Sequence, residues 1–294
     1  MNEIYGIVPP ITTPFTAEGQ VDEVALKEDI HYLIEVAGVH GLAVCGSTGE
    51  GHTLTTDETY RITACAVDES KGRTPVITGI ITDSTQSAIE RGQAVAELGI
   101  KALQVTPVHY LFRPNDDAMI QHFAKITEET GLPVIIYNVI PWTYLSPQLL
   151  TRIITEVEGV IGVKQSAGDM KLLADLLLLL GNRGRIMSAV DALLYPSFLL
   201  GAHGAIAAIL TAAPKLCVQL WEAVENGDYE TAKSLHELLL PVWNAISDDN
   251  LPANVKYVMQ LQGRASGKPR LPMPETEQHQ KEIIKKALLN ASLI

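Results

Sequence analysis

The 294-residue sequence predicts a (β/α)8 TIM barrel of the α/β class followed by a C-terminal helical appendage. Three observations predict this fold class: eight short apolar runs, helical patterns between them, and a tail in which such runs stop. Continuous apolar runs are typical of parallel strands that are covered on both faces. Eight strand–helix alternations in about 220 residues match the usual length of this barrel, whereas an open doubly wound sheet rarely uses eight parallel strands in so regular a series.

The expected strands are rich in β-branched and aliphatic residues, which favour extended structure. In chain order they cover residues 6–11, 41–45, 75–80, 102–106, 133–137, 160–164, 185–190 and 204–208.

Between these runs, apolar residues recur with helical spacing. Serine and asparagine favour the N-cap of a helix, and glycine commonly follows its last turn. Ser84 and Asn115 stand at two such starts, and Gly99 and Gly131 stand at the corresponding ends. The expected helices before the tail include residues 24–37, 84–98 and 115–130.

Beyond Trp221 the sequence predicts helices and no further strand. We expect a catalytic barrel over residues 1–224 and a helical region over residues 225–294, packed together because no flexible linker separates them. The tail helices are expected at residues 228–247, 253–262 and 275–289, with Pro269, Pro272 and Pro274 as breakers.

Composition and charge exclude several classes of protein. The net charge of −12 argues against a nucleic-acid partner, which requires a basic face, but leaves a small anionic substrate open because local groups set the potential of a cleft. The N-terminus lacks the pattern of a signal peptide. The leucine-rich stretch 172–180 is interrupted by Asp175 and is too short to span a bilayer, so we expect no membrane partner.

The cysteines and histidines give no sign of a disulfide or a metal site. Three widely spaced cysteines indicate core thiols of a cytoplasmic protein rather than a disulfide framework or a zinc site. The eight histidines include no His-x-x-x-His pair with a nearby acid. We therefore expect no metal and no cofactor.

Active sites of (β/α)8 barrels lie at the C-terminal ends of the strands, and this rule selects few side chains. Lys164 ends the sixth expected strand and Tyr137 ends the fifth. The glycine-rich turn Gly46-Ser47-Thr48-Gly49-Glu50 follows the second. A lysine, a phenol and an anion-binding turn could together form an imine with a 2-oxo acid and move its protons.

Lys164 has two possible roles. A free lysine is almost wholly protonated at neutral pH and is then a poor nucleophile, but an apolar barrel mouth disfavours the charged form of an amine. A neutral amine can attack a ketone, and the protonated imine acts as an electron sink for making or breaking an adjacent bond. The alternative is a structural lysine paired with a core carboxylate.

Tyr137 and the glycine-rich turn also have alternatives. Tyr137 could relay protons to and from the carbinolamine, or its ring could only pack at the barrel rim. The turn could bind a carboxylate through N–H groups and hydroxyls, or it could simply connect a strand to a helix. It lacks the Gly-Lys-Ser/Thr ending of a P-loop.

Taken together, the motifs Gly46-Ser47-Thr48-Gly49-Glu50, Tyr137-Asn138-Val139 and Gly162-Val163-Lys164 resemble those of the dihydrodipicolinate synthase and N-acetylneuraminate lyase family. The resemblance covers essentially the whole chain. It implies a barrel that usually assembles as a homotetramer and a Schiff-base lysine that captures pyruvate or another 2-oxo acid.

The resemblance also implies individual roles. Lys164 would form the imine, and Tyr137 would be the proton relay. Ser47 and Thr48 would hold the oxo-acid carboxylate, with Thr48 joining the relay. Ile206 would line the pyruvate pocket.

Two departures from the family pattern concern the second substrate. Dihydrodipicolinate synthases typically carry an arginine five residues after the tyrosine, where this chain has Trp142. Tryptophan offers an apolar face and one N–H donor but no charge, and is expected to pack against the substrate. The segment 106–114 resembles the loop that holds a tyrosine shared between subunits. Tyr110 is the candidate and His109 the rival, while Arg113 is a possible substitute for the missing arginine.

The leading interpretation is a class I, imine-forming lyase or aldolase that acts on a 2-oxo acid. The alternative is a dehydratase or deaminase of a 2-oxo-3-deoxy sugar acid or a hydroxyproline-derived imine acid, with the same lysine chemistry. A true dihydrodipicolinate synthase is disfavoured by Trp142. A barrel that only binds a metabolite and regulates is disfavoured by Lys164 and Tyr137, because such a protein needs no nucleophile.

Overall fold

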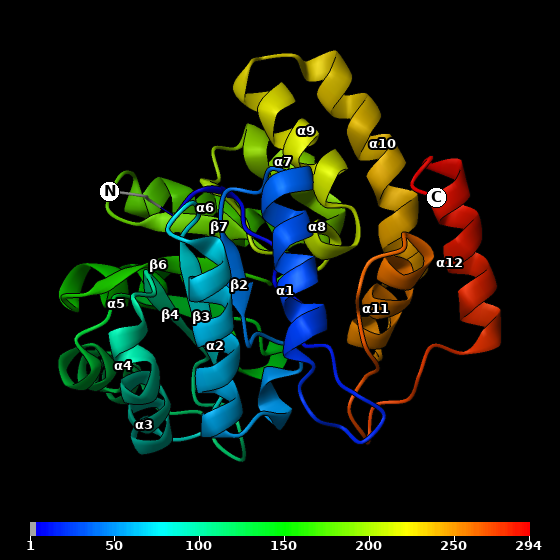
Figure 1. Cartoon of the computed structure of the whole chain (residues 1–294). Coiled ribbons are helices and arrows are strands. Elements are labelled where there is room, and N and C mark those ends of the chain that lie inside the picture. The colour runs from blue at the N-terminus through cyan, green and yellow to red at the C-terminus, as the bar shows by residue number, and fades with distance from the viewer. Residues whose placement is uncertain (1–3) are drawn as a thin grey trace.

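A computed structural model describes residues 4–294 and confirms the predicted barrel (Figure 1). All strands are parallel, and neighbours follow the order β1-β8-β7-β6-β5-β4-β3-β2. The ring closes where Pro10 bridges Ala43 and the Ala43 N–H donates to Pro9 O at 3.0 Å. The strands are β1 (Gly6–Ile7), β2 (Leu42–Val44), β3 (Val76–Ile80), β4 (Ala102–Val105), β5 (Val134–Asn138), β6 (Val160–Gln165), β7 (Arg185–Ser188) and β8 (Gly204–Ala205).

The strands are buried on both faces except at Ile161 and Arg185, which are half-buried, as their continuous apolar runs predict. The inward-facing side chains form a small cluster of their own inside the barrel, and the outward-facing ones join the large core beneath the helices. β1 is shorter than expected, because Pro9 and Pro10 have no N–H to donate to a ladder. The inner cluster includes Val8, Ala43, Ile77, Ala102, Ile135, Met187 and Ile206.

The capping residues begin and end the helices where the sequence predicts. The Ser84 hydroxyl accepts the Ser87 N–H, and Asn115 accepts the Ala118 N–H. The first helix differs from its prediction: it was expected to run to residue 37, but it ends at His31 and a π-helical turn follows at Tyr32–Val36. The helices are α1 (Glu23–His31), α2 (Thr56–Ser70), α3 (Thr85–Val95), α4 (Asp116–Thr130), α5 (Pro147–Glu156), α6 (Met170–Leu180), α7 (Leu194–Leu199), α8 (Ile209–Ala212), α9 (Pro214–Glu225), α10 (Tyr229–Ile246), α11 (Leu251–Leu261) and α12 (Gln278–Asn290).

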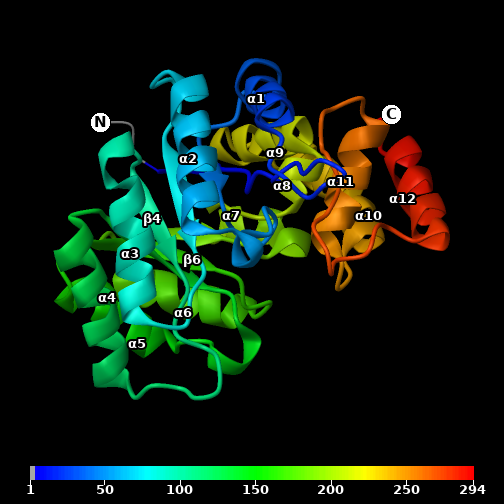
Figure 2. The same ribbon diagram turned by 60° about the horizontal axis from the view of Figure 1, so that its bottom comes forward.

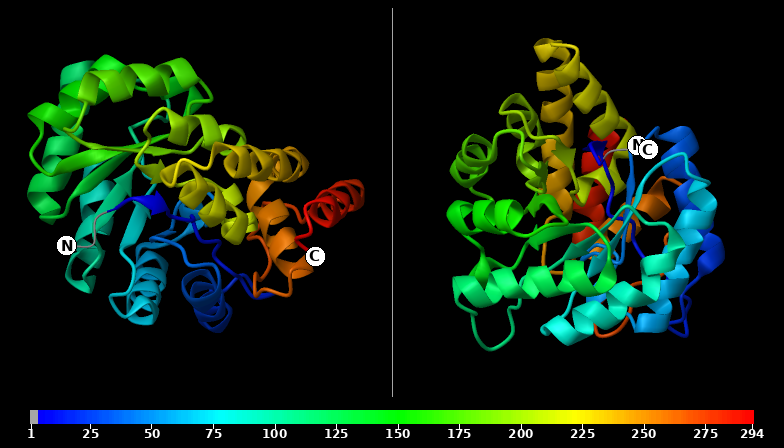
Figure 3. Two further views of the ribbon diagram at one scale, coloured as in Figure 1. Left: turned by 90° about the horizontal axis from the view of Figure 1, so that it is seen from above. Right: turned by 90° about the vertical axis from the view of Figure 1, so that its left-hand side faces the viewer.

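The tail helices α10, α11 and α12 stand together on the side of the barrel opposite α3, α4 and α5 (Figures 1 and 2). The view from above shows the same arrangement, with α12 outermost (Figure 3). α12 begins later than expected because Glu277 still has an extended backbone. The division of the chain at residues 224 and 225, just before α9 ends, stays a prediction. Among the described residues, no helix has the length and apolarity needed to cross a membrane.

Candidate active site

A cavity of about 780 Å³ lies at the C-terminal ends of the strands. Six of the predicted site residues line it, and Tyr110 does not. The six are Ser47, Thr48, Tyr137, Trp142, Lys164 and Ile206.

Lys164 and Tyr137 face each other across neighbouring strands. β5 and β6 pair in a register that sets Tyr137 beside Lys164, and the Lys164 Nζ lies 4.0 Å from the centroid of the tyrosine ring. Both side chains are buried, with exposures of 4% and 2%. No ion pair among residues 4–294 includes Lys164, so its amine is not held by a core carboxylate. The geometry therefore leaves the amine available to react with a ligand in the cavity.

The phenol of Tyr137 reaches the glycine-rich turn. Its hydroxyl donates a 2.9 Å hydrogen bond to Ser47 Oγ, although the two residues are 90 positions apart. Ser47 and Thr48 line the same cavity as Lys164, whose amine lies over the tyrosine ring. Hydroxyl groups arranged in this way can pass protons to and from a reacting group.

The turn itself has a tightly fixed backbone. The Gly51 N–H donates to Gly46 O at 2.9 Å, and the Thr13 hydroxyl donates to Gly49 O at 2.7 Å. A Cβ atom on Gly51 would lie 1.9 Å from Cys45 O, so only glycine fits at that position. The turn thus presents the hydroxyls of Ser47 and Thr48 to the cavity on a rigid support.

Asp191 is a cavity residue that the sequence analysis missed. It follows β7, and its Oδ1 accepts the Ile209 N–H at 2.8 Å. Burial raises the pKa of this carboxyl to about 6, while that hydrogen bond and the charge of Lys164 act in the opposite direction. The strand-end rule that selected Lys164 would also have selected Asp191. A carboxylate at this place can accept hydrogen bonds from hydroxyl or amine groups of a ligand.

Trp142 lies on the rim of the cavity rather than deep inside it. Its side chain is 70% exposed, and its indole N–H donates to His109 O at 3.1 Å. The one N–H donor of this side chain is therefore already used within the chain. Asn138 holds the start and end of this loop together, since its Oδ1 accepts the Leu145 N–H at 2.9 Å.

In the 106–114 loop, the neighbouring residues His109 and Tyr110 face different ways. The Oδ1 of Asp83 accepts the backbone N–H of His109 at 3.2 Å and that of Tyr110 at 2.8 Å. His109 lines the cavity of its own chain, whereas Tyr110 is 71% exposed. Arg113 donates to Tyr144 O at 3.4 Å and does not line the cavity of its own chain.

The helical tail supplies one wall of the cavity. Asp249, Leu251, Pro252 and Met273 all line it. No sequence signal marks these residues, because only tertiary packing brings the tail over the barrel mouth. The described residues that line the cavity include no arginine. Within residues 4–294 no group of three or more His, Cys, Asp or Glu side chains could hold a metal ion.

The fold and the site define a (β/α)8 barrel with a buried lysine at the end of its sixth strand. The chain belongs to the Dihydrodipicolinate synthetase family, whose profile matches residues 3–291. It is 34% identical over 295 residues to the 4-hydroxy-tetrahydrodipicolinate synthase of Methanopyrus kandleri, covering 99% of this chain and 98% of that protein.

Two solved structures of family relatives share the fold over nearly the whole chain. YagE from E. coli K12, a member of the dihydrodipicolinic acid synthase family solved with pyruvate, is 28% identical with a TM-score of 0.93, covering 99% of both chains. CdNal from Clostridium difficile, solved with mannosamine, is 27% identical with a TM-score of 0.90, covering 98% of this chain and 99% of that one.

Proposed function

We propose that the protein is a class I lyase or aldolase that forms a Schiff base with pyruvate or another 2-oxo acid through Lys164. The observation that carries this proposal is the buried Lys164 amine, which forms no ion pair among residues 4–294 and lies over the ring of Tyr137, whose hydroxyl bonds Ser47. The similarity to YagE, which was solved with pyruvate, supports the choice of ligand.

The reaction begins when the neutral amine of Lys164 attacks the keto carbon. The carbinolamine loses water to give a protonated imine, which accepts the electron pair of the C–C or C–H bond that breaks at the adjacent carbon and becomes an enamine. In the direction of condensation, the enamine donates this pair to the new C–C bond. Tyr137, whose hydroxyl is hydrogen-bonded to Ser47, donates and accepts the protons that these steps require. Ser47 and Thr48 bind the carboxylate, and Ile206 provides an apolar wall for the rest of the oxo acid.

The acidic residues of the cavity favour a second substrate rich in hydroxyl or amine groups. Asp191 and Asp249 line it, and no arginine does so among the described residues. The carboxylates of Asp191 and Asp249 disfavour a second substrate that carries a carboxylate of its own. The likeness to CdNal, which was solved with the sugar amine mannosamine, agrees with this choice.

The same lysine chemistry serves the alternative function, a dehydratase or deaminase of a 2-oxo-3-deoxy sugar acid or a hydroxyproline-derived imine acid. The synthase activity named for the Methanopyrus relative is the other candidate, and the absence of an arginine at Trp142 argues against it.

A panel of 2-oxo acids with product analysis tests the proposed function. We expect pyruvate and a hydroxylated aldehyde to condense, or a 2-oxo-3-deoxy sugar acid to release pyruvate. Loss of water or ammonia with the carbon chain intact would identify the alternative instead. Conversion that continues in a Lys164→Arg variant would contradict both interpretations, since both need the amine.

We also propose that the chain forms a homotetramer in which Tyr110 enters a neighbouring site. Tyr110, Leu111, Phe112 and Trp142 are all exposed on one chain, and such apolar surface favours association. Sedimentation is expected to show no substantial monomer at micromolar concentration.

Subunit exchange between Lys164→Arg and Tyr110→Phe variants should restore part of the activity, because one site of a mixed pair would then hold both native residues. His109→Asn serves as the control for the rival residue, and it should not complement Lys164→Arg, since His109 lines the cavity of its own chain. A fully active monomer would contradict the tetramer, and complementation by His109→Asn alone would assign the shared role to His109.

A further inference from the structure

We propose that Glu50 is a positioning residue, through which the helical tail holds the turn that binds the 2-oxo acid. This inference rests on the proposed function. It concerns a buried ion pair that the proposed chemistry does not use.

Glu50 receives both of its side-chain hydrogen bonds from the tail. Its Oε1 accepts the Lys256 Nζ at 2.6 Å, and its Oε2 accepts the Arg270 N–H at 2.8 Å. The exposures of Glu50 and Lys256 are 0% and 1%. Lys256 also donates to Lys268 O at 2.7 Å, so the segment after α11 is held at the same point. A single carboxylate thereby connects the barrel to two parts of the tail.

The backbone of Glu50 belongs to the turn itself. Its N–H donates to Ser47 O at 3.0 Å, and its φ of 54° is in the left-handed region, which a side chain with a Cβ adopts only when its surroundings hold it there. Ser47 in turn accepts the hydrogen bond of Tyr137. A rotation at Glu50 would therefore displace Ser47 and the adjacent Thr48.

The two partners of Glu50 also hold the wall of the cavity that the tail supplies. Lys256 lies on α11, whose first residues Leu251 and Pro252 line the cavity. The Arg270 carbonyl accepts the Met273 N–H at 3.0 Å, and Met273 lines the cavity as well. The carboxylate of Glu50 thus connects the turn to the wall that the tail supplies.

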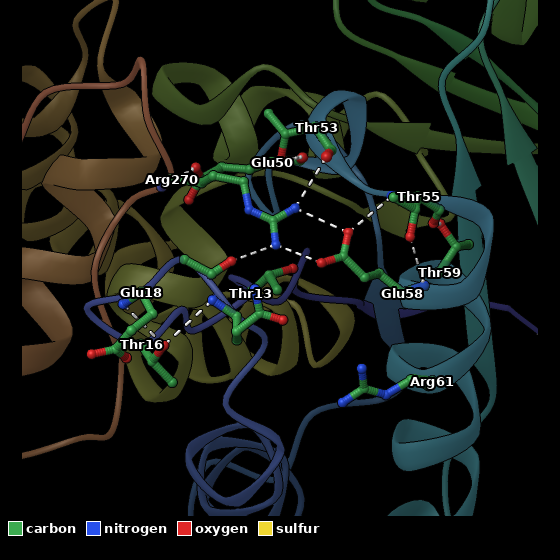
Figure 4. Close-up of polar contacts among 12 residues, drawn as sticks. Thr13, Thr16, Glu18, Glu50, Thr53, Thr55, Glu58, Thr59, Arg61 and Arg270 are labelled. Atoms are coloured by element: carbon green, nitrogen blue, oxygen red, sulfur yellow. Dashed lines mark hydrogen bonds and ion pairs between the residues drawn. The ribbon is translucent and has the colours of Figure 1, made fainter.

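The guanidinium of Arg270 strengthens the connection on the outer side of the turn (Figure 4). It donates to both oxygens of Glu58, at 2.5 and 3.0 Å, and to Thr53 O at 3.1 Å. The Thr53 hydroxyl donates to Glu50 O at 2.8 Å. A continuous series of hydrogen bonds therefore joins Arg270 of the tail to Glu50 of the turn through Thr53.

A purely stabilising role explains this pair poorly. Burying two charges costs about as much as their attraction returns, and apolar replacements of both partners are often neutral or stabilising. A second buried pair, Arg264 with Asp29, joins the tail to α1 with similar burial and without contact to the turn. It provides a matched control.

The experiment compares the double variants Glu50→Leu/Lys256→Met and Asp29→Leu/Arg264→Met. The readout is the pyruvate concentration that gives half-maximal inactivation by borohydride, with circular dichroism and thermal unfolding to measure the fold. We expect the Glu50 double variant to need about tenfold more pyruvate or worse, as misplaced binding groups predict. Its inactivation at saturating pyruvate should persist, because Lys164 is intact. The control should stay within about twofold of the wild type, because it shares no partner with the turn.

A folded Glu50 double variant with the half-saturating concentration of the wild type would overturn the inference. If that variant does not fold, Glu50→Gln, which keeps the volume and one acceptor, replaces it with the same expectation. Lys256→Arg keeps the cation and should retain most of the affinity. A wild-type protein that no 2-oxo acid renders sensitive to borohydride would instead contradict the proposed function, before any variant is compared.

Discussion

Replacing Lys164 with arginine is expected to abolish turnover while the chain stays folded. The guanidinium of arginine remains protonated and cannot add to a ketone. The fold should persist, because the arginine side chain resembles that of lysine in length and charge. The side chain ends in a cavity of about 780 Å³, which leaves room for the larger head group. Loss of a covalent nucleophile should lower kcat on the order of 10³-fold or more.

The control for this prediction is Lys125→Arg on the exposed face of α4, where the lysine pairs with Glu128. It should leave the steady-state rate unchanged, and circular dichroism should show both variants folded. Substantial turnover by folded Lys164→Arg would show that this amine is not the nucleophile.

Replacing Trp142 with arginine is expected to improve condensation of pyruvate with aspartate semialdehyde, which the present protein should catalyse poorly. The cavity walls formed by residues 4–294 offer no arginine to the carboxylate of that aldehyde, and a charge-assisted hydrogen bond is worth roughly 1.5–3 kcal/mol. The corresponding change in kcat/KM is about 10- to 150-fold.

Trp142→Phe is the matched control, because it keeps an aromatic ring and removes only the N–H that bonds His109 O. It should not raise the efficiency with aspartate semialdehyde. A wild-type efficiency typical of a biosynthetic enzyme would refute the expectation and favour the synthase activity named for the Methanopyrus relative.

The fold was predictable because its signals are local. Eight apolar runs identified eight strands, and capping residues such as Ser84 and Asn115 identified helix starts. The predicted bounds of β1 and the predicted end of the first helix were less accurate. Consecutive prolines shorten the strand, and no local signal marks the π-helical turn at Tyr32–Val36.

The candidate site was predictable only in part. Lys164 and Tyr137 follow from the rule that parallel strands end at one rim, and Asp191 follows from the same rule once applied to β7. Met273, and the contact of Lys256 with Glu50, depend on how the tail packs on the barrel, which no local pattern encodes. The proposed role of Tyr110 involves a second chain, which the pattern of one sequence does not describe.

The most direct test of the imine mechanism is the mass of the peptide that contains Lys164 after reduction with borohydride in the presence of pyruvate. The account predicts a single adduct, in which the imine has been reduced to a secondary amine at the Nζ of Lys164. No adduct should form when pyruvate or borohydride is omitted. A label on another lysine, or no label with any 2-oxo acid tested, would contradict it.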